Sequence, residues 1–374
     1  MKALVTGGSG FVGQYLLEQL IAEGYETRSL NRHPSPLLKK LGVEERLGSL
    51  DDFDAVDAAV RGCDVVFHIA AYPSIVMDPA PYYRTNILGS RNIVAACLRQ
   101  RVRKLVYTST QCVANTVESQ EGIDESVPYA PQFLGWYQMT KAVAEQFVRA
   151  ANYAPWTDDY DFLGLDFSEK NFRALAPRLA TRPVEKRDPL REDALLTVAL
   201  RPHLVWGPRD RHLVPRLLQR KRSGTLARVG DGTNRLATIY VENCAEAHLK
   251  ACEALVPGSP VPGSVYYIAQ EEPLNCWRWI DEILALAGEA PVEKSVSFQT
   301  AWRVGTVLEK VYSIFNKKKE PSMTRFLATQ LAKSYWYDTS RARNELGFTP
   351  RVSTQEGMRR LGEYIRESLL EKKS

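Results

Sequence analysis

Features that mark several protein classes are missing from this sequence. Its six cysteines form no Cys-x-x-Cys pair, and no histidine lies at ligand spacing beside one, so we expect no metal site. No run of about 18 apolar residues occurs, which argues against a transmembrane helix. The chain starts directly on a strand-like segment, without a basic and apolar leader. Together with the unpaired cysteines, these absences predict a reduced, cytoplasmic compartment.

A strong net charge is also missing. Lys and Arg number 49, and Asp and Glu number 44, which gives a net charge of +5. The basic residues are scattered along the chain, so we expect no nucleic-acid partner. One compact basic run is Lys317-Lys318-Lys319. Such a run is more typical of a solvated loop than of a contact with anionic lipid.

What the sequence does contain is a regular alternation of strand and helix patterns over 374 residues. This alternation predicts parallel βαβ units in a doubly wound α/β sheet. The expected strands cover residues 2–6, 26–30, 64–68, 104–108 and 195–200. The expected helices cover residues 11–23, 54–61, 86–100 and 137–150.

Two segments interrupt the alternation. Residues 152–193 are polar and aromatic, and we expect an insertion with short helices of its own, because such a long structureless stretch is uncommon in a compact domain. Residues 296–316 have the periodicity of an amphipathic helix. Its apolar face comprises Ala301, Val304, Gly305, Leu308, Val311, Tyr312 and Phe315. We expect this face to pack on the body of the protein, with a weak contact to a membrane surface or a partner as the less favoured alternative.

A glycine-rich turn is the strongest local signal. Gly7, Gly10 and Gly13 lie directly after the first expected strand and directly before the first expected helix. In that context Gly7 makes the tight turn, Gly10 lets the backbone approach a pyrophosphate, and Gly13 lets the helix pack closely on the sheet. The free N–H groups and the dipole of the helix N-terminus favour phosphate. The turn therefore predicts a dinucleotide-binding site.

The end of the second expected strand indicates which dinucleotide is preferred. NAD-binding proteins of this type carry an acidic residue there, about 20 residues past the turn, to hold the ribose 2′-hydroxyl. This chain has Asn31 followed by Arg32. A carboxylate would repel a 2′-phosphate, whereas Arg32 can pair with one. We therefore expect NADP(H) in preference to NAD(H), unless Arg32 is only a solvated loop residue.

Tyr137 and Lys141 lie four residues apart on an expected helix, and residues at this spacing share a helix face. A ketone that accepts hydride must also gain a proton on its oxygen. Tyrosine has an ordinary pKa of about 10, and a nearby ammonium favours the phenolate and brings that pKa closer to neutrality. Tyr129 is the competing proton donor, but Phe133 stands four residues after it, so we reject it.

These motifs together resemble an extended short-chain dehydrogenase/reductase with a Rossmann-type fold. The resemblance rests on residues 6–13, 64–71, 107–110, 137–141 and 201–208, and on Asn86. Residues 230–235 and 239–248 are similar to the 3β-hydroxysteroid dehydrogenase branch. Residues 297–303, 320–327 and 334–337 look most like the bacterial 2-alkyl-3-oxoalkanoate reductases of long-chain olefin biosynthesis. The similarity covers nearly all of the chain except 152–193.

The resemblance implies a division of the chain and a set of roles. Residues 1–200 would form the NADP-binding Rossmann domain, with the insertion at about 152–193. Residues 201–374 would form mostly a smaller substrate-binding lobe, with some segments returning to the core. Thr110 would hydrogen-bond the substrate oxygen, with Ser109 as the neighbour not excluded. Tyr137 would donate the proton, and Lys141 would also hold the nicotinamide ribose. The implied cofactor contacts are Gly7, Gly10, Phe11, Val12, Gly13, Asn31, Arg32, Ser49, Leu50, Ala70, Ala71, Asn86, Thr108, Tyr137, Lys141, Pro202 and Leu204.

Two departures from the family pattern bear on these roles. Ser49 stands where an Asp near the adenine is frequent, which leaves the adenine contact at that position less certain. Gln111 and Cys112 follow Thr110 where sugar-nucleotide dehydratases of the family carry acidic residues, which argues against elimination chemistry.

The implied reaction is the NADPH-dependent, reversible reduction of the ketone of a 2-alkyl-3-oxoalkanoic acid to the 2-alkyl-3-hydroxy acid. Phe298, Trp302, Leu308 and Phe326 could form apolar walls for this lipid-like substrate, although core packing is the more ordinary role for some of them. Arg235 could pair with the substrate carboxylate, or it could be a surface residue.

Three alternatives to this reaction remain. They are a 3β-hydroxysteroid or sterol dehydrogenase, a UDP-sugar 4-epimerase that holds NAD, and a non-enzymatic NADP-sensing protein. A homodimer formed through the helix that carries Tyr137 is a family expectation. Other enzymes of the same pathway are further candidate partners.

Overall fold

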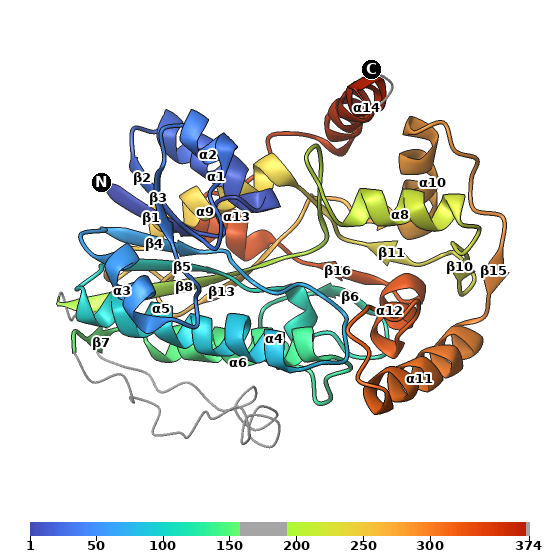
Figure 1. Ribbon diagram of the computed structural model, residues 1–374, viewed down its shortest axis with the longest axis horizontal. Helices are drawn as coiled ribbons and strands as arrows, with labels where there is room; N and C mark the ends of the chain where they lie inside the picture. The colour runs from blue at the N-terminus through green and yellow to red at the C-terminus, as the bar shows by residue number, and fades with distance from the viewer. Residues whose placement is uncertain (158–192, 372–374) are drawn as a thin grey trace.

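The computed structural model describes residues 1–157 and 193–371. It contains a large α/β part and a smaller lobe, which lie side by side in Figure 1. The predicted short helices of the insertion fall almost entirely on residues 158–192, outside the described residues. Among the described helices, none has the length and apolar character needed to cross a bilayer.

The large part is built on a parallel sheet, which confirms the predicted doubly wound α/β class. Its strands follow the order β13-β8-β5-β4-β1-β2-β3, and β7 is antiparallel to β8. Helices cover both faces of the sheet (Figure 1). The strands are β1 (Lys2–Thr6), β2 (Glu26–Asn31), β3 (Glu44–Leu47), β4 (Val65–His68), β5 (Lys104–Thr108), β7 (Ala154–Pro155), β8 (Ala194–Pro202) and β13 (Val265–Ile268). The helices of this part are α1 (Phe11–Ala22), α2 (Pro36–Lys40), α3 (Phe53–Val60), α4 (Ala80–Tyr82), α5 (Gly89–Arg99), α6 (Trp136–Ala150), α9 (Val241–Ala254) and α13 (Ser340–Leu346).

The predicted strands and helices are found close to their expected bounds, with two differences. The strand β3 was not expected, because an edge strand with half-buried and exposed polar residues shows no apolar alternation. The helix expected over 86–100 instead begins as a π-helix, η1 (Tyr83–Leu88), which continues into α5. Such wide turns are rare and frequently mark functional sites.

The smaller lobe draws on distant parts of the chain. Its four-stranded sheet has the order β14-β11-β16-β6, so β6 (Gln120–Ile123) from the first half of the chain pairs with β16 (Tyr335–Tyr337). In the other direction, β13 and α9 come from the second half and lie in the large part. The other lobe strands are β9 (Val205–Trp206), β10 (Arg228–Val229), β11 (Arg235–Leu236), β12 (Ile239–Tyr240), β14 (Leu274–Asn275) and β15 (Ser295–Val296). The lobe helices are α8 (Leu213–Arg222), α10 (Cys276–Leu286), α11 (Phe298–Ile314) and α12 (Arg325–Ala332).

The helix predicted over 296–316 is confirmed as α11, but its predicted apolar face does not pack as one surface. Ala301 and Gly305 are buried against the start of α12, where a Cβ on Gly305 would lie 2.6 Å from the carbonyl carbon of Thr324. Val304 and Phe315, in contrast, are 45% and 70% exposed. The expectation that the whole face packs on the body is therefore wrong for these two residues.

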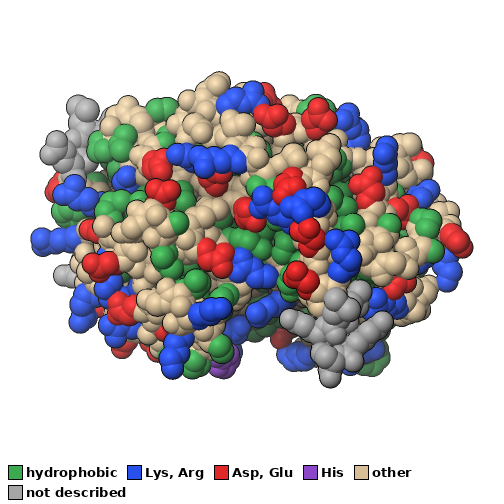
Figure 2. Space-filling model, turned by 90° about the horizontal axis from the view of Figure 1, so that it is seen from above, with side chains coloured by type: hydrophobic (Ala, Val, Ile, Leu, Met, Phe, Trp, Pro, Cys, Tyr) green, Lys and Arg blue, Asp and Glu red, His purple; other side chains and the backbone are tan. Residues whose placement is uncertain are grey.

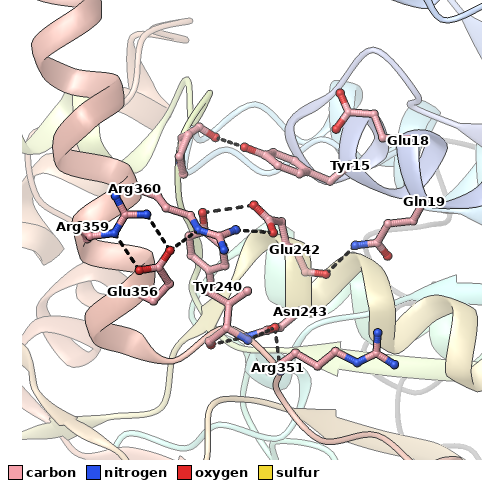
Figure 3. A network of polar contacts seen from close by, with 12 residues as sticks. Tyr15, Glu18, Gln19, Tyr240, Glu242, Asn243, Arg351, Glu356, Arg359 and Arg360 are labelled. Carbon is pink, nitrogen blue, oxygen red and sulfur yellow. Dashed lines mark hydrogen bonds and ion pairs between the residues drawn. The ribbon is translucent and has the colours of Figure 1, made fainter. Parts of the chain in front are cut away.

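The last helix, α14 (Thr354–Glu371), is fastened to α9 by polar contacts, and α9 is bonded in turn to α1 (Figure 3). Arg360 donates to Glu242 at 2.8 Å, and Gln19 donates to the backbone carbonyl of Glu242 at 3.0 Å. Asn243 donates to the carbonyl of Val352 at 2.7 Å and accepts from its N–H at 3.0 Å. These bonds connect the C-terminal segment to α9, and through α9 to α1 in the first half of the chain.

Charges of both signs are mixed over the face drawn in Figure 2, in agreement with the scattered basic residues of the sequence. The six cysteines are all buried and unpaired. Burial raises the pKa of the Cys112 and Cys244 thiols to about 12, so both behave as small apolar side chains.

Candidate active site

The turn between β1 and α1 has the geometry of a phosphate cradle. Gly7 has a φ of +72°, and the N–H of Gly10 donates to the carbonyl of Gly7 at 2.8 Å. A Cβ on Gly13 would lie 2.2 Å from that carbonyl oxygen, so only glycine fits there. No side chain caps the N-terminus of α1, which leaves its N–H groups for an anion. Phe11 and Val12 are the first residues of this helix.

The end of β2 brings the predicted specificity residues next to this turn. Asn31 is buried; its side-chain oxygen accepts from the N–H of Ser9 at 3.4 Å, and its amide donates to Glu45 at 3.3 Å. The same carboxylate oxygen of Glu45 accepts from the N–H of Ser35, so it is already occupied by two donors. Arg32 is exposed immediately after Asn31. The corner thus presents the exposed side chain of Arg32, and the preference for NADP(H) over NAD(H) stays a prediction.

The other predicted cofactor contacts follow the carboxyl ends of neighbouring strands. Ala70 lies against the glycine turn, since a Cβ on Gly7 would be 3.0 Å from its Cα. Asn86, in the π-helix, accepts from the N–H of Tyr72 at 2.8 Å and donates to Thr140 at 3.0 Å, which connects the segment after β4 to α6. Ala71 follows Ala70, Ser49 and Leu50 follow β3, and Pro202 and Leu204 lie at the end of β8. Ligands of doubly wound sheets bind along this edge.

The first turns of α6 carry the predicted catalytic pair. Lys141 is 2% exposed, and its Nζ donates to the carbonyl of Thr108 at 2.6 Å and lies 4.2 Å from the ring centre of Tyr107. Burial lowers the pKa of Lys141 to about 7, and the charge of Glu145 opposes this shift. Burial raises the pKa of Tyr137, partly offset by a hydrogen bond with Thr110. Tyr137 is therefore a protonated phenol at neutral pH, and the expected shift of its pKa toward neutrality is not found, because burial outweighs it.

The two candidate hydroxyls after β5 have different surroundings. Ser109 is buried, and its hydroxyl donates to Glu145 at 2.5 Å. Thr110 interacts with Tyr137 and donates to the side chain of Gln111 at 2.8 Å. The hydroxyl that lies beside the proton donor is thus that of Thr110, and this arrangement favours it over Ser109 as the substrate contact.

A buried ion pair behind these residues was missed by the sequence reasoning. Arg201 donates to both carboxylate oxygens of Glu145 at 2.6 and 3.0 Å, and the two side chains are 2% and 0% exposed. Tyr129, considered above only as a proton donor, donates to the same carboxylate at 2.6 Å. Glu145 stands four residues after Lys141 and therefore on the same helix face, which was the available signal. Glu145 connects α6 to Ser109, which precedes Thr110, and to Arg201, which precedes Pro202.

A mostly apolar pocket opens beside Tyr137. Its lining comes from the segment after β4, the start of α6 and the start of α12: Ser74, Ile75, Val76, Met77, Tyr82, Leu134, Gly135, Trp136, Tyr137, Gln138, Thr324 and Phe326. Phe326 was among the predicted walls. A mostly apolar cavity with the Tyr137 side chain in its wall suits an apolar ketone.

The remaining predicted substrate residues do not line this pocket. Phe298 and Trp302 form a tilted ring pair on α11, with centres 5.6 Å apart, below Lys333 and Arg325. Arg235 is exposed on β11, where its guanidinium donates to the carbonyl of Pro273 at 3.4 Å. Their roles toward a substrate stay predictions. Among the residues described, no group of three or more metal-ligating side chains occurs.

The sequence matches the model of the 3-beta hydroxysteroid dehydrogenase/isomerase family over residues 4–163 and 185–298. The chain belongs to this family. The matched ranges include the glycine turn, the segment from Thr110 to Lys141, and Glu145 and Arg201.

Two relatives are similar over almost their whole length. The 2-alkyl-3-oxoalkanoate reductase of Stenotrophomonas maltophilia is 39% identical over 96% of this chain and 98% of its own. The enzyme of the same name from Shewanella oneidensis is 38% identical over 96% of this chain and 85% of its own. The fold is shared more widely: the NAD complex of Thermus thermophilus UDP-glucose 4-epimerase superposes with a TM-score of 0.65 at 24% identity, covering 98% of this chain and 99% of that one.

Proposed function

We propose that this chain is an NADP(H)-dependent reductase of 2-alkyl-3-oxoalkanoic acids, with the 2-alkyl-3-hydroxy acid as product and a reversible reaction. The observation that carries the proposal is the position of Tyr137 in the wall of an apolar pocket, with Thr110 hydrogen-bonded to it and Lys141 one turn further along α6. The names of the two relatives at 38 and 39% identity support the same substrate class.

Each side chain has a role that follows from its surroundings. A nicotinamide cofactor, when bound, would supply the hydride in the reductive direction. Thr110 donates a hydrogen bond to the ketone oxygen and orients it. Tyr137, whose pKa is raised by burial, arrives protonated and gives its phenolic proton to the same oxygen. Lys141 stabilises the resulting phenolate when it is protonated, and it holds the nicotinamide ribose.

The absorbance of the nicotinamide band tests this function. We expect reduction of NADP+ by a synthetic long-chain 2-alkyl-3-hydroxy acid, a direction chosen because 3-oxo acids decarboxylate. A 3β-hydroxysterol and a UDP-sugar serve as comparison substrates. Turnover of the sterol alone would move the substrate class to the second candidate, a sterol dehydrogenase, which the family assignment favours. Turnover of none of them, with NADPH bound, would refute the proposal.

The cofactor preference depends on Arg32. We expect Arg32→Ser to lower kcat/KM for NADP(H) by about 10- to 100-fold, because a charge-assisted hydrogen bond contributes roughly 1.5–3 kcal/mol. The value for NAD(H) should change little, since NAD lacks the 2′-phosphate. Lys39→Ala removes an equal charge from the nearby helix α2 and should leave the preference intact. If the ratio of kcat/KM for NADP(H) to that for NAD(H) were unchanged in Arg32→Ser, the preference would belong to other residues.

We propose that the enzyme is cytoplasmic and forms a homodimer. Other enzymes of the same pathway are further proposed partners. The expected dimer contact through α6 has little surface to use, because the residues from Gln138 to Val148 are buried within the single chain. A homodimer would therefore form through other elements.

A further inference from the structure

The proposed substrate carries a carboxylate for which the catalytic residues named above provide no partner. In a 2-alkyl-3-oxo acid one carbon atom separates the carboxylate from the ketone, so both groups must be bound close together. The described residues that line the pocket beside Tyr137 include no lysine, arginine or histidine. Arg235, the predicted partner of the carboxylate, is exposed on β11, outside this lining. The anion is therefore expected to meet a neutral donor next to the ketone.

Gln111 is the side chain beside the hydroxyl that meets the ketone. It begins the short 3-10 helix η2 (Gln111–Val113), directly after Thr110. Thr110 donates to the side-chain oxygen of Gln111 at 2.8 Å, and the two residues are 5% and 4% exposed. A ketone oxygen that reaches the hydroxyl of Thr110 therefore brings the neighbouring carboxylate of the same molecule to Gln111.

The amide NH2 group of Gln111 lacks a strong acceptor. Its partner among the described residues is the sulfur of Cys112 at 3.1 Å. A thiol sulfur is a weak acceptor, and burial raises the pKa of the Cys112 thiol to about 12, so the sulfur carries no charge. Because buried polar groups normally have good partners, this amide indicates a place for an acceptor from outside the chain.

The turn that carries Gln111 is held in place from α6. Gln138 donates to the carbonyls of Cys112 at 2.7 Å and Asn115 at 2.9 Å, and its own side-chain oxygen accepts from the N–H of Leu134. Gln138 lines the pocket, but both protons of its amide are thus used within the chain. Gln111 is the neighbouring amide that still has a donor to offer, and a donor on a fixed turn loses little entropy on binding.

The buried carboxylate of Glu145 does not oppose an anion at Gln111, because it is already neutralised. Arg201 donates to both of its oxygens, and the hydroxyls of Ser109 and Tyr129 donate to it as well. Lys141 adds a positive charge whenever it is protonated. An anion beside Thr110 is therefore compatible with the charges around the catalytic pair.

We propose that the amide NH2 group of Gln111 binds the carboxylate of the 2-alkyl-3-oxo acid and thereby selects acids over their neutral esters. This role rests on the proposed function, since a substrate without a carboxylate has no use for the donor. On binding, the ketone oxygen takes the hydroxyl of Thr110, and the side chain of Gln111 is released to turn its NH2 group to the carboxylate. Two consecutive residues then hold the two oxygen functions of the substrate while Tyr137 faces the ketone.

The preference for acid over ester tests this role. Reduction of NADP+ is followed with a long-chain 2-alkyl-3-hydroxy acid and with its methyl ester, which keeps the hydroxyl and both alkyl arms but has no charge. We expect the wild type to favour the acid by at least about tenfold in kcat/KM, because hydrogen bonds to charged groups are the stronger kind.

Two substitutions at Gln111 should change this preference. Gln111→Met keeps the length of the side chain but removes the donor, and it should lower the acid-to-ester ratio of kcat/KM by about 10- to 100-fold. The loss should appear in KM for the acid with kcat nearly unchanged, because the carboxylate is held equally in the ground state and the transition state. Gln111→Glu should lower the ratio further, since it places a like charge beside the carboxylate.

Gln355→Met is the matched control, the same change at an exposed residue of α14. It should keep the wild-type ratio. Circular dichroism and NADPH binding verify that each variant is folded, and retained turnover of the ester shows that the catalytic pair is intact. If Gln111→Met does not fold, the ratio of the wild type still decides, because equal turnover of acid and ester would overturn the role of Gln111.

The remaining outcomes separate this role from the proposed function. An acid-to-ester ratio that stays at the wild-type value in both Gln111 variants would overturn the carboxylate contact and leave the function. An equal loss of kcat for acid and ester would limit Gln111 to orienting Thr110 and would also overturn the contact. No turnover of either compound by the wild type, with NADPH bound, would refute the function and the contact together.

Discussion

Tyr137→Phe is expected to lower kcat by about a thousandfold while NADPH affinity stays nearly unchanged. The substitution removes one oxygen atom, and with it the proton that the ketone oxygen must gain; positioned general acids typically contribute 10²- to 10⁴-fold. The apolar ring and the helix spacing remain, so the pocket beside Tyr137 should keep its shape. The measurement is steady-state turnover together with the fluorescence of bound NADPH.

The matched control is Tyr364→Phe, the same chemical change on the distant helix α14. It should leave both turnover and NADPH binding at the wild-type level. If Tyr137→Phe retained turnover, the proton would have to come from another group, and the assignment of the catalytic pair would fail.

Glu145→Gln is expected to destabilise the protein by about 3–5 kcal/mol. The substitution leaves the guanidinium of Arg201, 2% exposed, without an opposite charge, and a buried charge without its partner is costly. Denaturant unfolding measures the loss. Glu118→Gln serves as the control, because its partner Lys333 is at a similar distance, 2.9 Å, but Glu118 is 76% exposed. Surface pairs of that kind contribute less than about 1 kcal/mol.

The same substitution should change the pH dependence of turnover. The charge of Glu145 raises the pKa of Lys141, which burial has lowered to about 7. Without the carboxylate this pKa falls further, so Lys141 loses its proton at lower pH. The decline of turnover that accompanies its deprotonation should therefore begin at a more acidic pH in the variant. A loss of stability with an unchanged pH profile would limit Glu145 to a structural role.

Much of the site could be predicted because its signals are local. The glycine turn needs only a strand, three glycines and a helix, and the pair Tyr137–Lys141 needs only helix spacing. The partners of Glu145 could not be found in this way. Arg201 stands 56 positions further along the chain, and only the pairing of β5 with β8 places it beside α6.

The face through which α11 packs could not be predicted from the sequence for another reason. An apolar stripe has the same periodicity whether it packs on a core or faces outward, and the helix has two candidate faces. Gly305 decided between them, since its missing Cβ permits the close approach of Thr324. The edge strand β3 could not be predicted, because a strand of half-buried and exposed polar residues shows no apolar periodicity.

The order of strands in the sheet has a consequence for synthesis on the ribosome. β5 at residues 104–108 is flanked in the finished sheet by β8, which begins at Ala194, and β8 in turn by β13, which begins at Val265. Until the later segments emerge, β5 presents an unpaired edge and Glu145 lacks its partner Arg201. A nascent chain with a bare strand edge is prone to aggregate. We therefore expect chaperone dependence to end only when β13 has been released, at about 70% of the chain.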